Sequence, residues 1–389
     1  MFARLPEERM AATPSVASIK KHFRRLHDPR VRGRTKHLLI DLLVLALCGV
    51  IANCDDWPDI ALFARQRETW FRRFLRLPGG IPAHDTFERV FAALNPHALE
   101  ACCLGWLRAV AGLAGVEHIA IDGKSLRGSA SGKLGALHVV SAWATAAQVS
   151  LAQVAVEGKG NEITAIPKLL DLLDLDGALV TIDAIGCQKG IAKKIVDRGG
   201  DYVLVAKANQ KRLLADIQET VTKALDGDLP AGRVRHCTTR ERGHGRTEER
   251  SGVIIEEVSG IRDRAAWPHL RVVGMCRRER TVNGVQTEDV CYFIGSRRMP
   301  ARRYLATLRN HWGIENNLHW QLDVSFHEDA SRVENRHGAA NLSLFRKLAL
   351  SLLKQNGRKE SMARKRKAAA VDPGYLAEII TGATKVEEV

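Results

Sequence analysis

The sequence predicts an α/β protein with a mixed sheet and flanking helices, a β-rich insertion, and an all-helical domain before the sheet. Helical spacing of apolar residues runs through residues 38–115, and short apolar runs of strand length replace it from Glu117 onward. The 389-residue chain is long enough for two or three domains. Its composition, 45% hydrophobic and 26% charged, is that of a globular protein.

Residues 1–37 form a predicted basic N-terminal arm that leads directly into the helical domain. Because its basic residues adjoin a folded unit, we expect the arm to contact DNA; the alternative is a solvated tail. The residues expected to make this contact are Lys20, Lys21, Arg24 and Arg25. In residues 38–115, a predicted DNA-binding domain, we expect a buried helix over 38–53, a second from about Trp57, and a third capped by Asp85.

Residues 116–356 are predicted to form one larger domain. Its expected strands are 118–122, 137–145, 150–156, 178–183 and 201–206, with helices at 163–173 and 188–198. This order, β-β-β-α-β-α-β, is that of the ribonuclease H-like fold, in which the first and fourth strands lie side by side.

The second half of this domain is interrupted by a predicted β-rich insertion at about residues 230–296. Asn283-Gly284 is typical of a two-residue hairpin turn within it. Helical character resumes at Arg302 and continues to about Gln355, and residues 357–389 are predicted to be a basic C-terminal tail.

Two of the predicted strands end in an aspartate, Asp122 and Asp183. An ionised aspartate is costly to bury, so each needs a cation, a hydrogen-bonding partner or water. The fold order brings the two together. The chain also carries 59 Lys and Arg against 44 Asp and Glu, a net charge of +15 that favours a polyanionic partner, although a globular protein can be basic without one. Acidic metal ligands in a nucleic-acid-binding protein fit both observations; capping of ordinary strand ends is the alternative.

Near the end of this domain, four polar residues recur at helical intervals of four: His311, Glu315, His319 and Asp323. Such a stripe lines a site or faces solvent. The neighbouring tryptophans and aliphatic residues indicate partial burial and favour a site.

Three segments, Ile121-Asp122-Gly123-Lys124-Ser125-Leu126-Arg127-Gly128, Thr181-Ile182-Asp183-Ala184-Ile185-Gly186-Cys187-Gln188 and residues 311–324, closely resemble the DDE-type transposases of bacterial insertion sequences, in the H-repeat-associated branch. The resemblance implies that Asp122, Asp183 and Glu315 are catalytic and bind Mg²⁺ or Mn²⁺, two ions in all. Carboxylate oxygens are suitable ligands for such ions. It further implies cleavage and strand transfer of double-stranded DNA, at element ends and target, by a homodimer assembled on DNA.

At the positions expected to support phosphate binding, the sequence departs from the pattern of related transposases. Lys124 and Arg127 are candidate DNA contacts, or belong to an exposed turn. Related transposases often have an arginine four residues before the glutamate and a lysine seven after it. Here those positions hold His311 and Leu322, and Arg309 and Lys347 are the candidate replacements.

Other assignments remain open in the same region. Asp323, Glu328 and Asp329 are rivals of Glu315 for the third acidic position. His311 and His319 are expected to contact phosphate or to hydrogen-bond, since the chain has no cysteine partners for zinc near them.

Two other functions fit the same residues: a ribonuclease H-like metal-dependent nuclease without strand transfer, and an inactive DNA-binding protein derived from an element. The eight cysteines include no C-x-x-C pair, and no secretory signal is apparent. We therefore expect reduced thiols and a cytoplasmic, nucleoid-associated protein.

Overall fold

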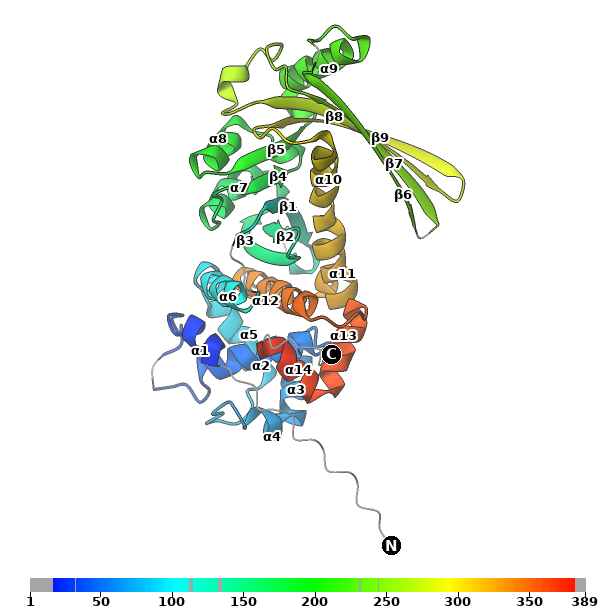
Figure 1. The fold of residues 1–389 in the computed structure, drawn as a ribbon. Coiled ribbons are helices and arrows are strands. Elements are labelled where there is room, and N and C mark those ends of the chain that lie inside the picture. The colour runs from blue at the N-terminus through cyan, green and yellow to red at the C-terminus, as the bar shows by residue number, and fades with distance from the viewer. Residues whose placement is uncertain are drawn as a thin grey trace.

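The computed structural model describes residues 17–31, 33–111, 115–131, 135–230, 232–243 and 245–381. The first sixteen residues of the predicted arm, Arg32 and the last eight residues of the predicted tail lie outside the described part. A helical unit lies at one end of the molecule and a long, twisted sheet at the other (Figure 1).

The helical unit is built around one apolar helix. Eleven of the 13 residues of this helix, α2, are buried, as the apolar run that follows Asp41 requires. Asp56 caps α3 by accepting the Asp59 N–H, whereas the expected cap Asp85 instead lies in the first turn of α5 and pairs with Arg89 at 3.0 Å. The helices of this unit are α1 (Ala17–Phe23), α2 (Leu39–Ile51), α3 (Trp57–Gln66), α4 (Glu68–Phe71), α5 (His84–Ala93) and α6 (Pro96–Ala111).

Part of the predicted arm is a docked helix. Ile19 and Phe23 of α1 are buried, and Phe23 packs edge-on against Trp106 of α6. The basic residues of this segment point away from that contact and are exposed: Lys20, Lys21, Arg24 and Arg25.

The sheet has nine strands in the order β3-β2-β1-β4-β5-β9-β8-β7-β6. β1, β2 and β3 form an antiparallel meander, and β4 lies parallel to both β1 and β5. The predicted adjacency of the first and fourth strands is confirmed, and with it the ribonuclease H-like core. The strands of this core are β1 (His118–Leu126), β2 (Leu137–Ala144), β3 (Val149–Glu157), β4 (Leu179–Ile182) and β5 (Asp201–Ala206).

The segment predicted as a β-rich insertion extends this same sheet. β9 pairs antiparallel with β5, and Asn283 and Gly284, with φ of 49° and 80°, make the tight turn between β8 and β9. A helix that the sequence analysis did not identify, α9 (Lys211–Asp226), precedes the added strands. Those strands are β6 (Val234–Gly243), β7 (Arg246–Ile255), β8 (Val272–Val282) and β9 (Val285–Gly295).

Helices cover both faces of the sheet. In β5, Tyr202 and Leu204 join the core cluster that contains the helices α7 (Glu162–Asp171), α8 (Lys189–Asp197) and α9, while Val203 and Val205 pack toward α10 (Ala301–His311). After α10 the chain continues through a π-helical turn (Glu315–His319) into α11 (Trp320–Phe326).

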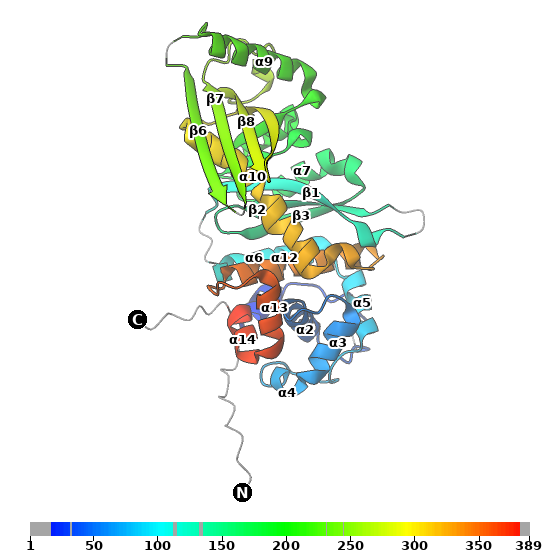
Figure 2. The ribbon, with the colours of Figure 1, turned by 90° about the vertical axis from the view of Figure 1, so that its right-hand side faces the viewer.

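The helix α12 (Arg336–Gln355) lies between the sheet and the helical unit (Figure 2) and is buried over most of its length. The segment predicted as a basic tail contains two more helices, α13 (Met362–Val371) and α14 (Pro373–Thr381), which pack on α2. Arg366 is fully buried there and donates hydrogen bonds to the Val50 carbonyl and to Asp55. This cation therefore makes contacts within the protein. Within the described residues, no helix is long and apolar enough to cross a membrane.

Candidate active site

Asp122 and Asp183 occupy neighbouring positions on adjacent parallel strands. Ile121 of β1 is paired with Ile182 of β4, and each aspartate is the next residue. Asp183 follows the last residue of β4, as expected, and accepts the Ile185 N–H at 3.1 Å. Asp122, expected at a strand end, lies inside β1, because residues 123–126 continue to pair with β2 after β4 has ended. The two aspartates therefore lie side by side at the point where β4 ends and β1 continues paired with β2 alone.

A third carboxylate, Glu162, lies against these strands and was missed by the sequence analysis. It is the first residue of α7, is buried, and bonds His138 Nε2 at 3.1 Å. A Cβ on Gly123 would stand 2.8 Å from the Glu162 carboxylate, so only glycine fits beside Asp122. His138 Nδ1 lies 3.1 Å from the Ser125 hydroxyl. Since an ionised carboxylate only accepts, His138 donates to Glu162 through Nε2 and fixes its direction.

Four carboxyl groups lie close enough to influence one another's charge: those of Asp122, Asp183, Glu162 and Glu315. Burial raises the pKa of Asp122 to about 7, and the charges of Asp183, Glu162 and Glu315 act in the same direction. Burial, followed by the charge of Glu162, also raises the pKa of Asp183. A concentration of buried oxygen donors with excess negative charge fits a hard divalent cation such as Mg²⁺ or Mn²⁺. In the described part of the chain, no three His, Cys, Asp or Glu side chains already stand in a metal-binding arrangement.

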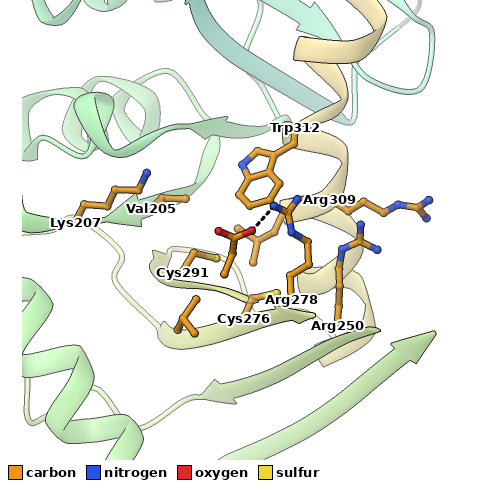
Figure 3. Close-up of a pocket in the computed structure, with 11 residues that line it drawn as sticks. Val205, Lys207, Arg250, Cys276, Arg278, Cys291, Arg309 and Trp312 are labelled. Atoms are coloured by element: carbon orange, nitrogen blue, oxygen red, sulfur yellow. Dashed lines mark hydrogen bonds and ion pairs between the residues drawn. The ribbon is translucent and has the colours of Figure 1, made fainter. Parts of the chain in front are cut away.

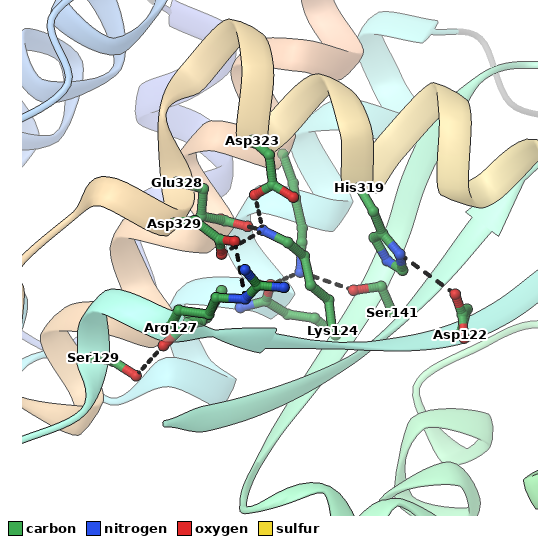
Figure 4. Close-up of polar contacts among 12 residues, drawn as sticks. Asp122, Lys124, Arg127, Ser129, Ser141, His319, Asp323, Glu328 and Asp329 are labelled. Carbon is green, nitrogen blue, oxygen red and sulfur yellow. Dashed lines mark hydrogen bonds and ion pairs between the residues drawn. The ribbon is translucent and has the colours of Figure 1, made fainter. Parts of the chain in front are cut away.

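The polar stripe faces this site. His311, at the end of α10, is buried and its Nδ1 lies 3.1 Å from the Thr181 hydroxyl of β4. His319 Nδ1 lies 3.4 Å from Asp122 Oδ2 (Figure 4). Between them, the π-helical turn carries Glu315, whose side chain is exposed and makes no ion pair among the described residues. Burial lowers the pKa of His311 to about 4 and that of His319 to about 3, so both rings are neutral at pH 7.

Lys124 joins the rivals of Glu315 in a separate network (Figure 4). Its ammonium pairs with Asp323, with Glu328 at 2.8 Å and with Asp329 at 3.4 Å. Burial alone would lower the pKa of Lys124, but the carboxylates of Glu328 and Asp323 outweigh it and raise that pKa. The Lys124 ammonium is therefore occupied by protein carboxylates. The three rival acids are in turn paired with Lys124.

The other predicted basic contacts differ in access. The Arg127 side chain is 82% exposed, and its one ion pair among the described residues is a long contact of 3.4 Å from Nε to Asp329 Oδ2. Arg127 is therefore available to an external phosphate. Arg309 pairs with Glu241 on β6. Lys347 is buried in α12 and donates to Ser141 and Gln153 at 2.8 and 2.6 Å, which removes it as a direct DNA contact.

Comparison with known families identifies the class of protein. Residues 20–107 match the family described as DDE_Tnp_1-associated, and residues 114–352 match the Transposase DDE domain. The second match covers more than half of the chain. The chain therefore belongs to the DDE transposase family.

Individual relatives place it in the H-repeat-associated branch. It is 36% identical over 383 residues to "Putative transposase YncI" of Escherichia coli O157:H7, covering 96% of both chains. It is 33% identical over 377 residues to "H repeat-associated putative transposase YhhI" of Escherichia coli K12, covering 94% of this chain and 98% of that protein. Among solved structures, a piggyBac transposase synaptic complex with hairpin DNA aligns with a TM-score of 0.39 and 8% identity, over 98% of this chain and 80% of that one, a likeness too slight to carry an argument.

Proposed function

We propose that this protein cleaves double-stranded DNA at the ends of an insertion sequence and transfers the released strands to target DNA, with Asp122, Asp183 and Glu315 as the catalytic carboxylates. The adjacency of Asp122 and Asp183 in the strand register carries the proposal. Glu315 supports it, because its charge acts on Asp122 from the opposite, helical side of the site.

The proposed cofactor is Mg²⁺ or Mn²⁺, held by Asp122, Asp183 and Glu315. Two such ions, when bound, activate the attacking oxygen and stabilise the leaving 3′ oxygen of an in-line phosphoryl transfer. The protein contributes the carboxyl groups of these three residues, two of them at neighbouring positions on adjacent strands. His319 lies beside Asp122 as a neutral ring and so adds no competing positive charge. Because burial raises the pKa of Asp122 to about 7, its carboxyl group would have to lose a proton at lower pH before it could hold a cation.

The proposed substrate contacts are spread over two parts of the chain. Exposed cations on and after α1, together with exposed Arg127 next to the site, offer phosphate contacts to a duplex. The resemblance to insertion-sequence transposases further suggests a homodimer that pairs two element ends.

The test is cleavage of a labelled duplex that carries the terminal repeat flanking this gene, with Mg²⁺, Mn²⁺ or EDTA. Glu315→Gln removes a proposed ligand and nearly preserves shape; Glu360→Gln, at an exposed position in the loop before α13, is the matched control. We expect metal-dependent cleavage by the wild type and the control, and a loss of at least about 100-fold in Glu315→Gln with DNA binding retained.

The products separate the alternatives. Cleavage followed by joining to target DNA supports the transposase. Cleavage without joined products indicates the nuclease alternative, and binding without cleavage in any divalent metal indicates an inactive DNA-binding protein.

A further inference from the structure

A basic pocket lies beside the carboxylates, where β5 meets the added strands and α10. It encloses about 110 Å³. Its floor is apolar, with Val205 and Leu308 among the lining side chains. Its cations, which we call the basic pocket residues, are Lys207, Arg250, Arg278 and Arg309. Figure 3 shows Trp312 and Arg278 facing one another, with Lys207 on one side and Arg250 and Arg309 on the other.

The three arginines are held in place by neighbouring groups. Arg278 stacks over the Trp312 ring at 4.3 Å and pairs with Asp289 at 2.5 Å. Arg250 and Arg309 both pair with Glu241, the former at 3.8 Å. These contacts restrict the guanidinium groups, but they also neutralise much of their charge.

Lys207 differs from the arginines because no ion pair or hydrogen bond of its ammonium is present among the described residues, and its side chain is exposed. The strand register places Asp183 beside Val205, since Ile182 pairs with Leu204. Lys207 is two residues beyond Val205 and therefore continues the same face of the strand, toward the pocket.

We propose that the basic pocket binds a backbone phosphodiester of the DNA strand next to the scissile position, with Lys207 making the direct ion pair. The apolar floor suits the attached sugar, and the immobilised arginines supply further donors. The inference rests on the proposed function for the identity of the DNA. Lys207 also places a cation close to the carboxylates. The two positions four residues before and seven after Glu315 hold buried His311 and buried Leu322 instead of cations.

The test pairs a protein change with a change in the DNA. Lys207→Gln is compared with Lys211→Gln, an exposed lysine at the start of α9 that does not line the pocket. The terminal-repeat duplex carries a neutral methylphosphonate at each backbone position around the element boundary in turn. Affinity is measured in EDTA, by fluorescence anisotropy, over a range of salt concentrations.

We expect Lys207→Gln to weaken binding about 3- to 10-fold and to lower the salt slope by about one, with Lys211→Gln close to wild type. A methylphosphonate at one position weakens wild-type binding by a similar factor and has no further effect on Lys207→Gln. The proposal would be overturned if, at every backbone position, the affinity losses from the methylphosphonate and from Lys207→Gln simply multiplied. An unchanged salt slope in Lys207→Gln would also overturn it.

Cleavage assays on the same proteins keep this inference separate from the proposed function. Coupling here means that the effect of one methylphosphonate disappears in Lys207→Gln. If this coupling is found but the wild type never cleaves, the pocket assignment stands and the catalytic proposal fails. If it cleaves but shows no coupling, the catalytic proposal stands and the pocket assignment fails.

Discussion

Replacing Asp122 by asparagine is expected to stabilise the metal-free protein while it abolishes DNA cleavage. The pKa of Asp122 is raised from 3.8 to about 7, so the folded protein binds more protons than the unfolded chain between these values. Stability therefore falls as the pH rises through this window and stays lower above pH 7. Asparagine carries no charge, so this loss is absent in the variant.

The magnitude follows from the size of the shift. About three pKa units correspond to at most about 4 kcal/mol. The Asp122 side chain is 20% exposed, and screening by water reduces the effect, so we expect about 2 kcal/mol. For a chain of this length, such a gain raises Tm by roughly 3 °C.

The assay is thermal unfolding in EDTA from pH 5 to pH 8.5, with Asp226→Asn as a control at an exposed carboxylate. The advantage of Asp122→Asn over wild type should grow up to about pH 7 and then level off, and Mg²⁺ at pH 8 should raise the Tm of wild type more than that of the variant. A variant no more stable than wild type at pH 8, or an advantage independent of pH, would refute the electrostatic reasoning.

Three further predictions concern the surroundings of the carboxylates and the DNA-binding surface. Glu162→Gln should reduce cleavage by about 10- to 100-fold with DNA affinity unchanged, because it removes a carboxylate beside Asp122; equal cleavage rates would show that Glu162 only supports the fold. Glu328→Gln should lower the free energy of unfolding by about 3 kcal/mol in urea titrations, since it breaks a buried ion pair with Lys124; a change below about 0.5 kcal/mol would contradict the importance of that pair. Neutralising the four exposed cations around α1 should weaken DNA binding and reduce the salt slope by up to about four, and an unchanged slope would make them passive; the residues are Lys20, Lys21, Arg24 and Arg25.

The strand order and the meeting of Asp122 with Asp183 could be predicted from sequence because both follow from local patterns and one topological rule. Apolar runs define the strands, and the ribonuclease H-like order brings the first and fourth together. The residues after Asp122 illustrate the limit of such patterns. Gly123 and Lys124 do not resemble a strand, yet they continue β1 because β2 supplies their partners.

Other features depend on contacts between distant segments, which no local pattern encodes. Glu162 looks like an ordinary acidic residue in a first helical turn, and only the packing of α7 on the sheet brings it to Gly123. Arg366 lies in a run of basic residues typical of a solvated tail, yet it is buried against Val50. The network around Lys124 joins residues about 200 positions apart in the chain.

The most direct test of the central claim is to locate a bound divalent ion. Crystals grown at pH 8 and soaked with Mn²⁺ should give an anomalous peak between the carboxylates of Asp122 and Asp183, and the peak should be absent in Asp183→Asn. An anomalous peak confined to Asp323 and Glu328, or no peak at Asp122 in crystals of an active preparation, would contradict the account.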